Sequence, residues 1–131
     1  EECPVRGGRA RQSGLIGIDA ASEAITADGQ EAYNLFVQHG IDNVILMGVH
    51  RSMCVLGRPV GIRQMVTVGK SVVLVRDMTD TMYNPKKRPF VSHFAGTDLV
   101  VQHVEKFWCP SITSTALTGK APFRFKNDPR K

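Results

Sequence analysis

The sequence has no long apolar run, few cysteines and few aromatic residues. A membrane span needs about 18 consecutive apolar residues, and no stretch of this chain approaches that length. The three cysteines, Cys3, Cys54 and Cys109, stand far apart without a C-x-x-C pair, which excludes a disulfide framework and a zinc finger of the usual spacing. We therefore expect no membrane partner, no cofactor, no assignable metal ligands and a reducing compartment, with the cytoplasm favoured.

The net positive charge is also small over most of the chain. Residues 1–118 hold 12 Lys and Arg against 11 Asp and Glu, whereas residues 119–131 hold 5 against 1. A charge excess confined to one end is more typical of a solvated tail than of a phosphate-binding surface. With 42% hydrophobic and 22% charged residues, we predict one globular domain over 1–118, a basic C-terminal tail over 119–131, and no nucleic-acid partner.

Short apolar runs at regular intervals predict the fold class. Runs of strand length begin at Leu15, Val44 and Val72, and a shorter one surrounds Ile112. The first three starts lie 29 and 28 residues apart, which is the spacing of βαβ units. We predict an α/β fold in which helices flank a parallel sheet, and strands at Val44–Met47 and Val72–Val75 that are buried on both faces.

Three helices are expected between and after these strands. Asp28 and Glu31 form a capping-box-like start for the first, and Gly40 ends it. The second is expected from Cys54 to Val68, with Gly69 as its stop. The third is expected to begin at Thr97 as its N-cap and to stop at Pro110. Its apolar stripe is predicted to comprise Leu99, Val100, His103, Val104 and Phe107.

The carboxyl ends of the second and third strands carry the residues that could perform chemistry. Cys54 follows the second strand in a strand-to-helix turn, where a helix beginning at Cys54 would stabilise a thiolate. On spacing alone, the favoured interpretation of Cys54 is a small apolar residue packed under the helix. Asp77 and Asp80 follow the third strand and could bind a metal or orient a catalytic group, although an aspartate at a strand end more often caps a turn. His93 and His103 are interpreted as ordinary partly exposed or core histidines.

A longer pattern decides between the two readings of Cys54. The segment Gly48-Val49-His50-Arg51-Ser52-Met53-Cys54-Val55 resembles the nucleophile turn of the isochorismatase-like cysteine hydrolases, the superfamily of the nicotinamidases and N-carbamoylsarcosine amidases. The resemblance continues through GRPVGIRQMV, VVLVRDMTDTMYNP and SHFAGTDLVVQHVEKFWCPSITS, and covers about residues 28 to 126. It implies a Rossmann-like three-layer α/β fold, of which this chain is similar to the C-terminal portion.

The resemblance also implies roles for particular residues. Cys54 corresponds to the nucleophile, and the backbone N–H groups of His50 and Cys54 correspond to the oxyanion hole. The Val49–His50 peptide corresponds to a cis bond. Arg51 stands where the family commonly has Thr, and we expect its side chain to reach the mouth of the pocket and bind an anionic substrate group. The substrate is expected to be a small molecule with an amide or related C–N bond.

Two family features have no counterpart among these residues. The acid/base Asp would precede residue 1, and no Lys occurs before Lys70. The resemblance further implies that the first two strands are missing, which would leave Val44–Met47 at a sheet edge. We therefore expect self-association and no hydrolase activity from residues 1–131 alone. The alternative function is a binding or assembly protein that keeps the fold without catalysis.

Overall fold

The structure is a computed structural model that describes residues 14–19 and 21–129. Cys3, the irregular N-terminal residues up to 13, and the tail residues Arg130 and Lys131 lie outside the described residues. The helices are α1 (Gly29–Gln38), α2 (Ile62–Thr67), α3 (His93–Phe107) and α4 (Thr115–Thr118). The strands are β1 (Asn43–Val49), β2 (Ser71–Asp80) and β3 (Ser111–Ile112), and a π-helical turn, η1, spans Arg51–Val55.

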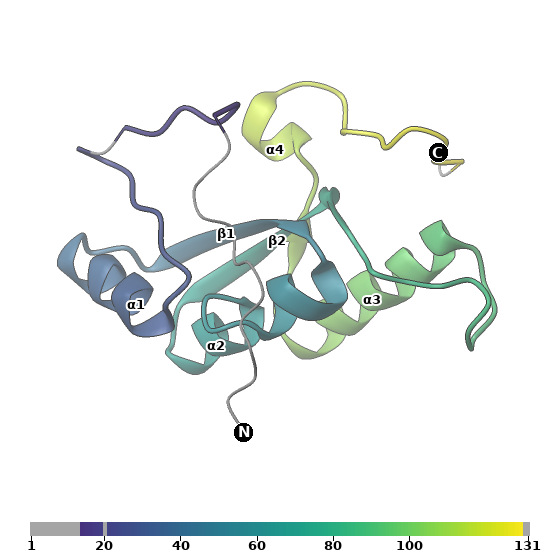
Figure 1. Ribbon diagram of the computed structural model, residues 1–131, viewed down its shortest axis with the longest axis horizontal. Coiled ribbons are helices and arrows are strands. Elements are labelled where there is room, and N and C mark those ends of the chain that lie inside the picture. Colours follow the sequence, from purple (N-terminus) through teal and green to yellow (C-terminus); the bar gives the residue numbers. More distant parts are fainter. Residues whose placement is uncertain (1–13, 20, 130–131) are drawn as a thin grey trace.

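The described residues form an α/β fold around a three-stranded parallel sheet of order β1-β2-β3. Helices α1, α2 and α3 lie on one side of the sheet and α4 on the other (Figure 1). The core forms between the sheet and the first three helices, because their apolar faces meet there. Its buried members are Val55, Leu56, Ile62, Met65, Val72, Leu74, Val104 and Cys109. In this part of the chain, no helix is both long and apolar enough to cross a membrane.

The strand predicted at Leu15–Ile18 does not form. These residues lie in a turn and an irregular stretch, and Leu15 is 97% exposed. A strand needs a hydrogen-bonded neighbour, and no described strand pairs with this segment. The prediction of a βαβ unit is therefore correct for the two strands that begin at Asn43 and Ser71, and it is wrong for the segment that begins at Leu15.

Strand β1 lies at the edge of the sheet, as the resemblance implies, but it is not buried on both faces. Its residues alternate between half-buried and exposed, and Ile45, Met47 and Val49 are 48%, 44% and 59% exposed. All three point to the same face, because side chains alternate along a strand. The prediction of two-sided burial for Val44–Met47 is wrong because no described element covers this face of β1.

Strand β2 is the central strand, and three of the four residues of its apolar run are buried as predicted, whereas Val73 is half-buried. Val72, Leu74 and Val75 are 5%, 0% and 0% exposed. The strand continues past this run to Asp80, and its register with β1 shifts on the way. The offset between paired residues is 28 at Leu46↔Leu74 and 31 at Gly48↔Thr79. Strand β2 thus contains a bulge between these two pairs.

Helix α1 begins and ends as predicted. The Asp28 carboxylate accepts hydrogen bonds from the backbone N–H groups of Gln30 and Glu31. The Glu31 carboxylate accepts from the hydroxyl of Thr26, which in turn accepts from the Asp28 N–H. The second half of the capping box therefore runs through Thr26. The chain leaves the helix at Gly40, whose φ of +62° is easily adopted only by glycine.

The helix predicted from Cys54 to Val68 is divided into η1 and α2. The helical conformation starts earlier than predicted, at Arg51, and α2 begins only at Ile62. Pro59 lies between η1 and α2. Proline has no backbone N–H to donate to a helical carbonyl, which favours an interruption of the helix there. Gly61 then passes so close to the preceding turn that an added Cβ would lie 2.9 Å from the Val55 carbonyl oxygen. The predicted stop at Gly69 is confirmed, with φ of +82°.

Helix α3 begins five residues before the predicted start, with His93 as its first helical residue. Ser92 is the N-cap, and its hydroxyl accepts from the Ala95 N–H. Thr97 lies inside the helix and is buried, so the prediction that it caps the helix is wrong. Of the predicted stripe only Val104 is fully buried, because the buried face comprises Gly96, Thr97, Val101 and Val104. Pro110 follows the helix end, as predicted.

Candidate functional site

The turn that follows β1 holds the predicted nucleophile. Gly48, near the end of β1, has a φ of +113°, which an L side chain rarely adopts. The Val49–His50 peptide bond is cis, which confirms the prediction made from the resemblance. The His50 carbonyl then accepts from the backbone N–H groups of Met53 and Val55, at 3.1 and 3.2 Å. These bonds close the turn η1 directly at the carboxyl end of β1.

Cys54 is a free, partly exposed cysteine inside this turn. His50 directly precedes this turn as its N-cap, and Cys54 lies inside it. In the described part of the chain, no histidine, lysine or carboxylate forms a hydrogen bond with the Cys54 thiol. Cys109, by contrast, is buried in the core, and burial raises the pKa of its thiol. Of these two cysteines, only Cys54 stands on a turn that follows a strand and reaches solvent.

Arg51 does not reach the mouth of a pocket. Its side chain is 0% exposed. Its guanidinium donates to the backbone carbonyls of three residues that are distant from it in the sequence. The acceptors are the carbonyl oxygens of Arg76, Thr79 and Thr97 at 2.7, 2.7 and 3.0 Å. The Arg51 Nε also donates to the Thr79 hydroxyl at 2.9 Å. The prediction of an anion-binding Arg51 at the surface is therefore wrong, since its N–H groups point into the protein.

Two of the three carbonyls that accept from Arg51 come from the bulge in β2. Arg76 and Thr79 lie in the segment where the register with β1 shifts. Carbonyl groups that leave a sheet ladder need other donors when they are buried, and the planar guanidinium supplies several at once. The Thr79 hydroxyl completes the arrangement by donating to the Val75 carbonyl at 3.0 Å. Arg51 therefore ties the turn of Cys54 to β2 and, through the Thr97 carbonyl, to α3.

Asp80, at the end of β2, contacts the start of α3. Its Oδ1 lies 2.8 Å from His93 Nε2 and 3.4 Å from the Thr97 hydroxyl oxygen. Burial raises the pKa of Asp80, but the hydrogen bond and charge of His93, with further hydrogen bonds from Thr81 and Thr97, outweigh it and hold the pKa below its ordinary value. Asp80 and His93 thus hold each other in place between the end of β2 and the start of α3. His93 is partly buried and paired.

Asp77 points to the other side of β2 and holds the C-terminal segment. Its carboxylate accepts from the N–H and hydroxyl of Ser114, at 2.8 and 2.6 Å, and from the Phe123 N–H at 2.8 Å. Burial raises the pKa of Asp77, but these hydrogen bonds outweigh it and the pKa is lowered. Residues 119–129 therefore do not form a purely solvated tail, because Phe123 anchors them to β2.

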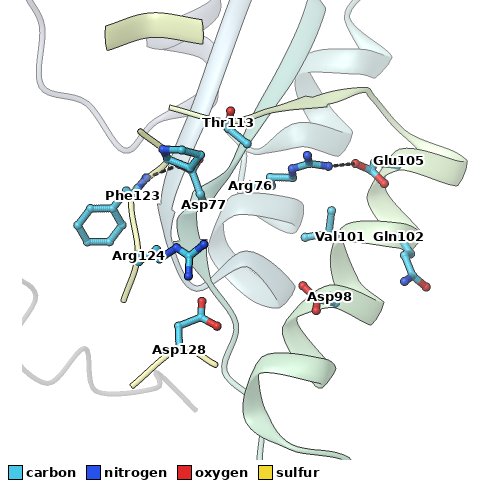
Figure 2. Close-up of a pocket in the computed structure, with 11 residues that line it drawn as sticks. Arg76, Asp77, Asp98, Val101, Gln102, Glu105, Thr113, Phe123, Arg124 and Asp128 are labelled. Atoms are coloured by element: carbon cyan, nitrogen blue, oxygen red, sulfur yellow. Dashed lines mark hydrogen bonds and ion pairs between the residues drawn. The ribbon is translucent and has the colours of Figure 1, made fainter. Parts of the chain in front are cut away.

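This anchoring forms a polar cleft of about 480 Å³ between the C-terminal segment and α3 (Figure 2). Arg76 spans it toward Glu105, at 3.7 Å. The carboxylates of Asp98 and Asp128 face the hollow, whereas the Phe123 ring points away from it (Figure 2). Neither His50 nor Cys54 lines this cleft. Among the described residues, no three His, Cys, Asp or Glu side chains come together as the ligands of one metal ion.

Comparison with protein-family models, curated proteins and solved structures finds no significant match to this chain. The assignment of function therefore depends on the residues themselves.

Sequence reasoning missed the group of residues around Arg51. Thr79 and Thr97 are buried acceptors, yet a threonine that follows a strand or lies in a helix is common in any sequence. The bulge in β2 brings them to Arg51, and a bulge has no reliable sequence signal here because no glycine marks it. Asp80 and His93 were both considered, but their 13-residue separation gave no indication that they would meet.

Proposed function

We propose that this chain carries the nucleophile, Cys54, of an isochorismatase-like cysteine hydrolase that cleaves an amide or related C–N bond of a small molecule. The observation that carries the proposal is the position of Cys54. A partly exposed thiol lies on a strand-to-helix turn at the carboxyl end of β1, where parallel α/β sheets place their chemistry. The sequence resemblance over residues 28 to 126 supports the same conclusion.

The proposed reaction has two steps. The Cys54 thiolate attacks the carbonyl carbon, the C–N bond breaks, and the amine leaves after it takes up a proton. Water then attacks the thioester carbon, which releases a carboxylic acid and regenerates the thiol. In both steps the backbone N–H groups of His50 and Cys54 would stabilise the oxyanion.

The buried Arg51 supports this chemistry without touching the substrate. Catalysis requires that the nucleophile and the oxyanion donors keep their relative positions. Arg51 is the first residue of η1, and its hydrogen bonds reach both β2 and α3. It therefore acts as a positioning residue for the turn, in place of the substrate-binding role that the sequence suggested.

A second candidate function is a binding or assembly protein that has the fold without catalysis. One observation favours it. No basic side chain among the described residues is hydrogen-bonded to Cys54, and nucleophilic cysteines are ordinarily activated by a neighbouring base or cation. Strand β1 would then be the assembly surface, because its exposed edge carries no charge or proline that would prevent pairing with a second copy.

Thiol alkylation separates the two functions. Iodoacetamide is applied at pH 7 to the folded chain and to the chain unfolded in urea, and peptide mapping gives the rate at each cysteine. If the turn activates Cys54, its rate in the folded chain should exceed its unfolded rate by about tenfold or more. Cys109 should be slower when folded, because burial protects it. A Cys54→Ser variant identifies the peptide that carries the signal.

The comparison with the unfolded chain is the critical control. An exposed thiol without activation reacts no faster when folded than when unfolded, so mere accessibility cannot produce the expected ratio. A folded rate at or below the unfolded rate would contradict a Cys54 nucleophile and favour the assembly protein.

A further inference from the structure

The imidazole of His93 lies between two hydrogen-bond acceptors. Its Nε2 is 2.8 Å from Asp80 Oδ1, and its Nδ1 is 3.3 Å from the Tyr83 carbonyl oxygen. A carbonyl can only accept a hydrogen bond, and so can an ionised carboxylate. Both ring nitrogens can therefore donate at the same time only when the imidazole carries two protons and a positive charge.

The doubly protonated ring connects three parts of the structure. His93 is the first residue of α3, Asp80 ends β2, and Tyr83 follows β2 in the chain. When the ring loses one proton, one of its nitrogens becomes an acceptor that faces another acceptor. One of the two contacts is then lost. The neutral ring therefore keeps only one of these two contacts, and the ion pair that the protonated ring forms with Asp80, between the start of α3 and the end of β2, is lost.

Two short routes lead from this contact to the turn of Cys54. Asp80 pairs with Val49 in the sheet, and Val49 directly precedes His50. On the second route, Thr97 contacts Asp80 through its hydroxyl, and its carbonyl accepts from Arg51 at 3.0 Å. Arg51 begins the same turn that contains Cys54. Asp80 therefore takes part in both routes of contact that lead to this turn.

We infer that His93 is a positioning residue that makes the geometry of the Cys54 turn depend on pH. The charged and titratable groups that share its contacts are Asp80 from β2, Tyr83 from the following segment and, through Thr97, Arg51 from η1. The Phe94 ring packs edge-on against the imidazole at 5.7 Å. The inference depends on the proposed function, since it concerns the activation of the proposed nucleophile.

The test compares Cys54 alkylation in the wild-type chain and in His93→Gln over pH 5.5 to 9. Glutamine keeps a neutral donor for Asp80 but does not titrate. We expect the wild-type rate to exceed the variant rate by about threefold at the acidic end, as for one hydrogen bond of typical strength. The ratio should approach one at the alkaline end, because the wild-type ring is then neutral as well.

The matched control is His103→Gln, which changes a histidine on the exposed side of the same helix. Its rate ratio to the wild type should stay close to one at every pH. A ratio for His93→Gln that differs from one but does not change with pH would show a structural role only and would overturn the inference. A ratio of one throughout would also overturn it. Neither result affects the comparison of folded and unfolded Cys54, which tests the nucleophile itself.

Discussion

Strands β1 and β2 begin with almost the same apolar sequence and have different surroundings. Val44–Met47 and Val72–Val75 are both runs of four apolar residues. In β2 the run is covered on both faces and has a strand on either side, whereas in β1 every second residue is exposed and the described structure gives the strand one neighbour. A continuous apolar run therefore predicts a strand, but the neighbouring elements decide its burial.

The two strands also differ after their apolar runs. Strand β1 ends at Val49 and passes directly into the turn of Cys54. Strand β2 continues through a bulge whose polar residues hold other segments: Arg76 and Thr79 accept from Arg51, Asp77 holds Ser114 and Phe123, and Asp80 holds His93. The central strand thus organises the structure, and the edge strand presents the candidate nucleophile.

The two strands should differ most in how much stability is lost when an apolar side chain is truncated to alanine. Leu74→Ala in β2 should lower the free energy of unfolding by about 3 kcal/mol, because Leu74 is 0% exposed and its removal leaves a void. Ile45→Ala in β1 should cost less than about 1 kcal/mol, since this side chain is 48% exposed. Urea unfolding of both variants measures the difference. Equal costs would mean that the face of β1 is covered in solution.

The second effect concerns the link between the strands. Arg51→Met should lower the free energy of unfolding by about 2 kcal/mol, because it removes the hydrogen bonds that the buried guanidinium donates to the carbonyls of Arg76, Thr79 and Thr97. Arg58→Met is the matched control in the same segment, and its exposed side chain should change stability by less than about 0.5 kcal/mol. Similar unfolding midpoints for the two variants would show that the Arg51 hydrogen bonds contribute little.

The third effect is a pH dependence that arises on β2. The pKa of Asp77 is lowered in the folded chain, so its contribution to stability is fully present above the ordinary aspartate pKa of about 3.9. It is lost as the pH falls through the folded value. Asp77→Asn should cost about 1 kcal/mol at pH 7. The unfolding midpoints of variant and wild type should converge below pH 4, and a gap that stays constant down to pH 2 would contradict this account.

The smallest expected change in stability is on the exposed face of β1. Met47→Lys should alter the free energy of unfolding by no more than about 0.5 kcal/mol, because the side chain is 44% exposed. The added charge should reduce self-association through the strand edge, which sedimentation velocity measures. Leu99→Lys on α3 places the same charge at a residue that is 46% exposed. If both variants associate equally, the edge of β1 is not the contact.

The sequence predicted the elements whose signals are local. The start of α1 at Asp28 and its end at Gly40 follow from side-chain capping and from a backbone conformation that favours glycine. Strand β2 and the turn of Cys54 were found by their apolar pattern and by the resemblance. The start of α3 was misplaced because Ser92 and Thr97 are both good N-cap residues, and packing at Thr97 decided between them.

By itself, the sequence determined the α/β class, the parallel pairing of β1 with β2, and the position of Cys54 between a strand and a helix. Only the tertiary structure decided that Arg51 points inward and that Asp80 meets His93. The physical reason is that apolar periodicity and capping act over a few residues. The hydrogen-bond partners of a buried guanidinium lie 25 to 46 residues away, and the bulge that presents two of them forms only when the strands pair.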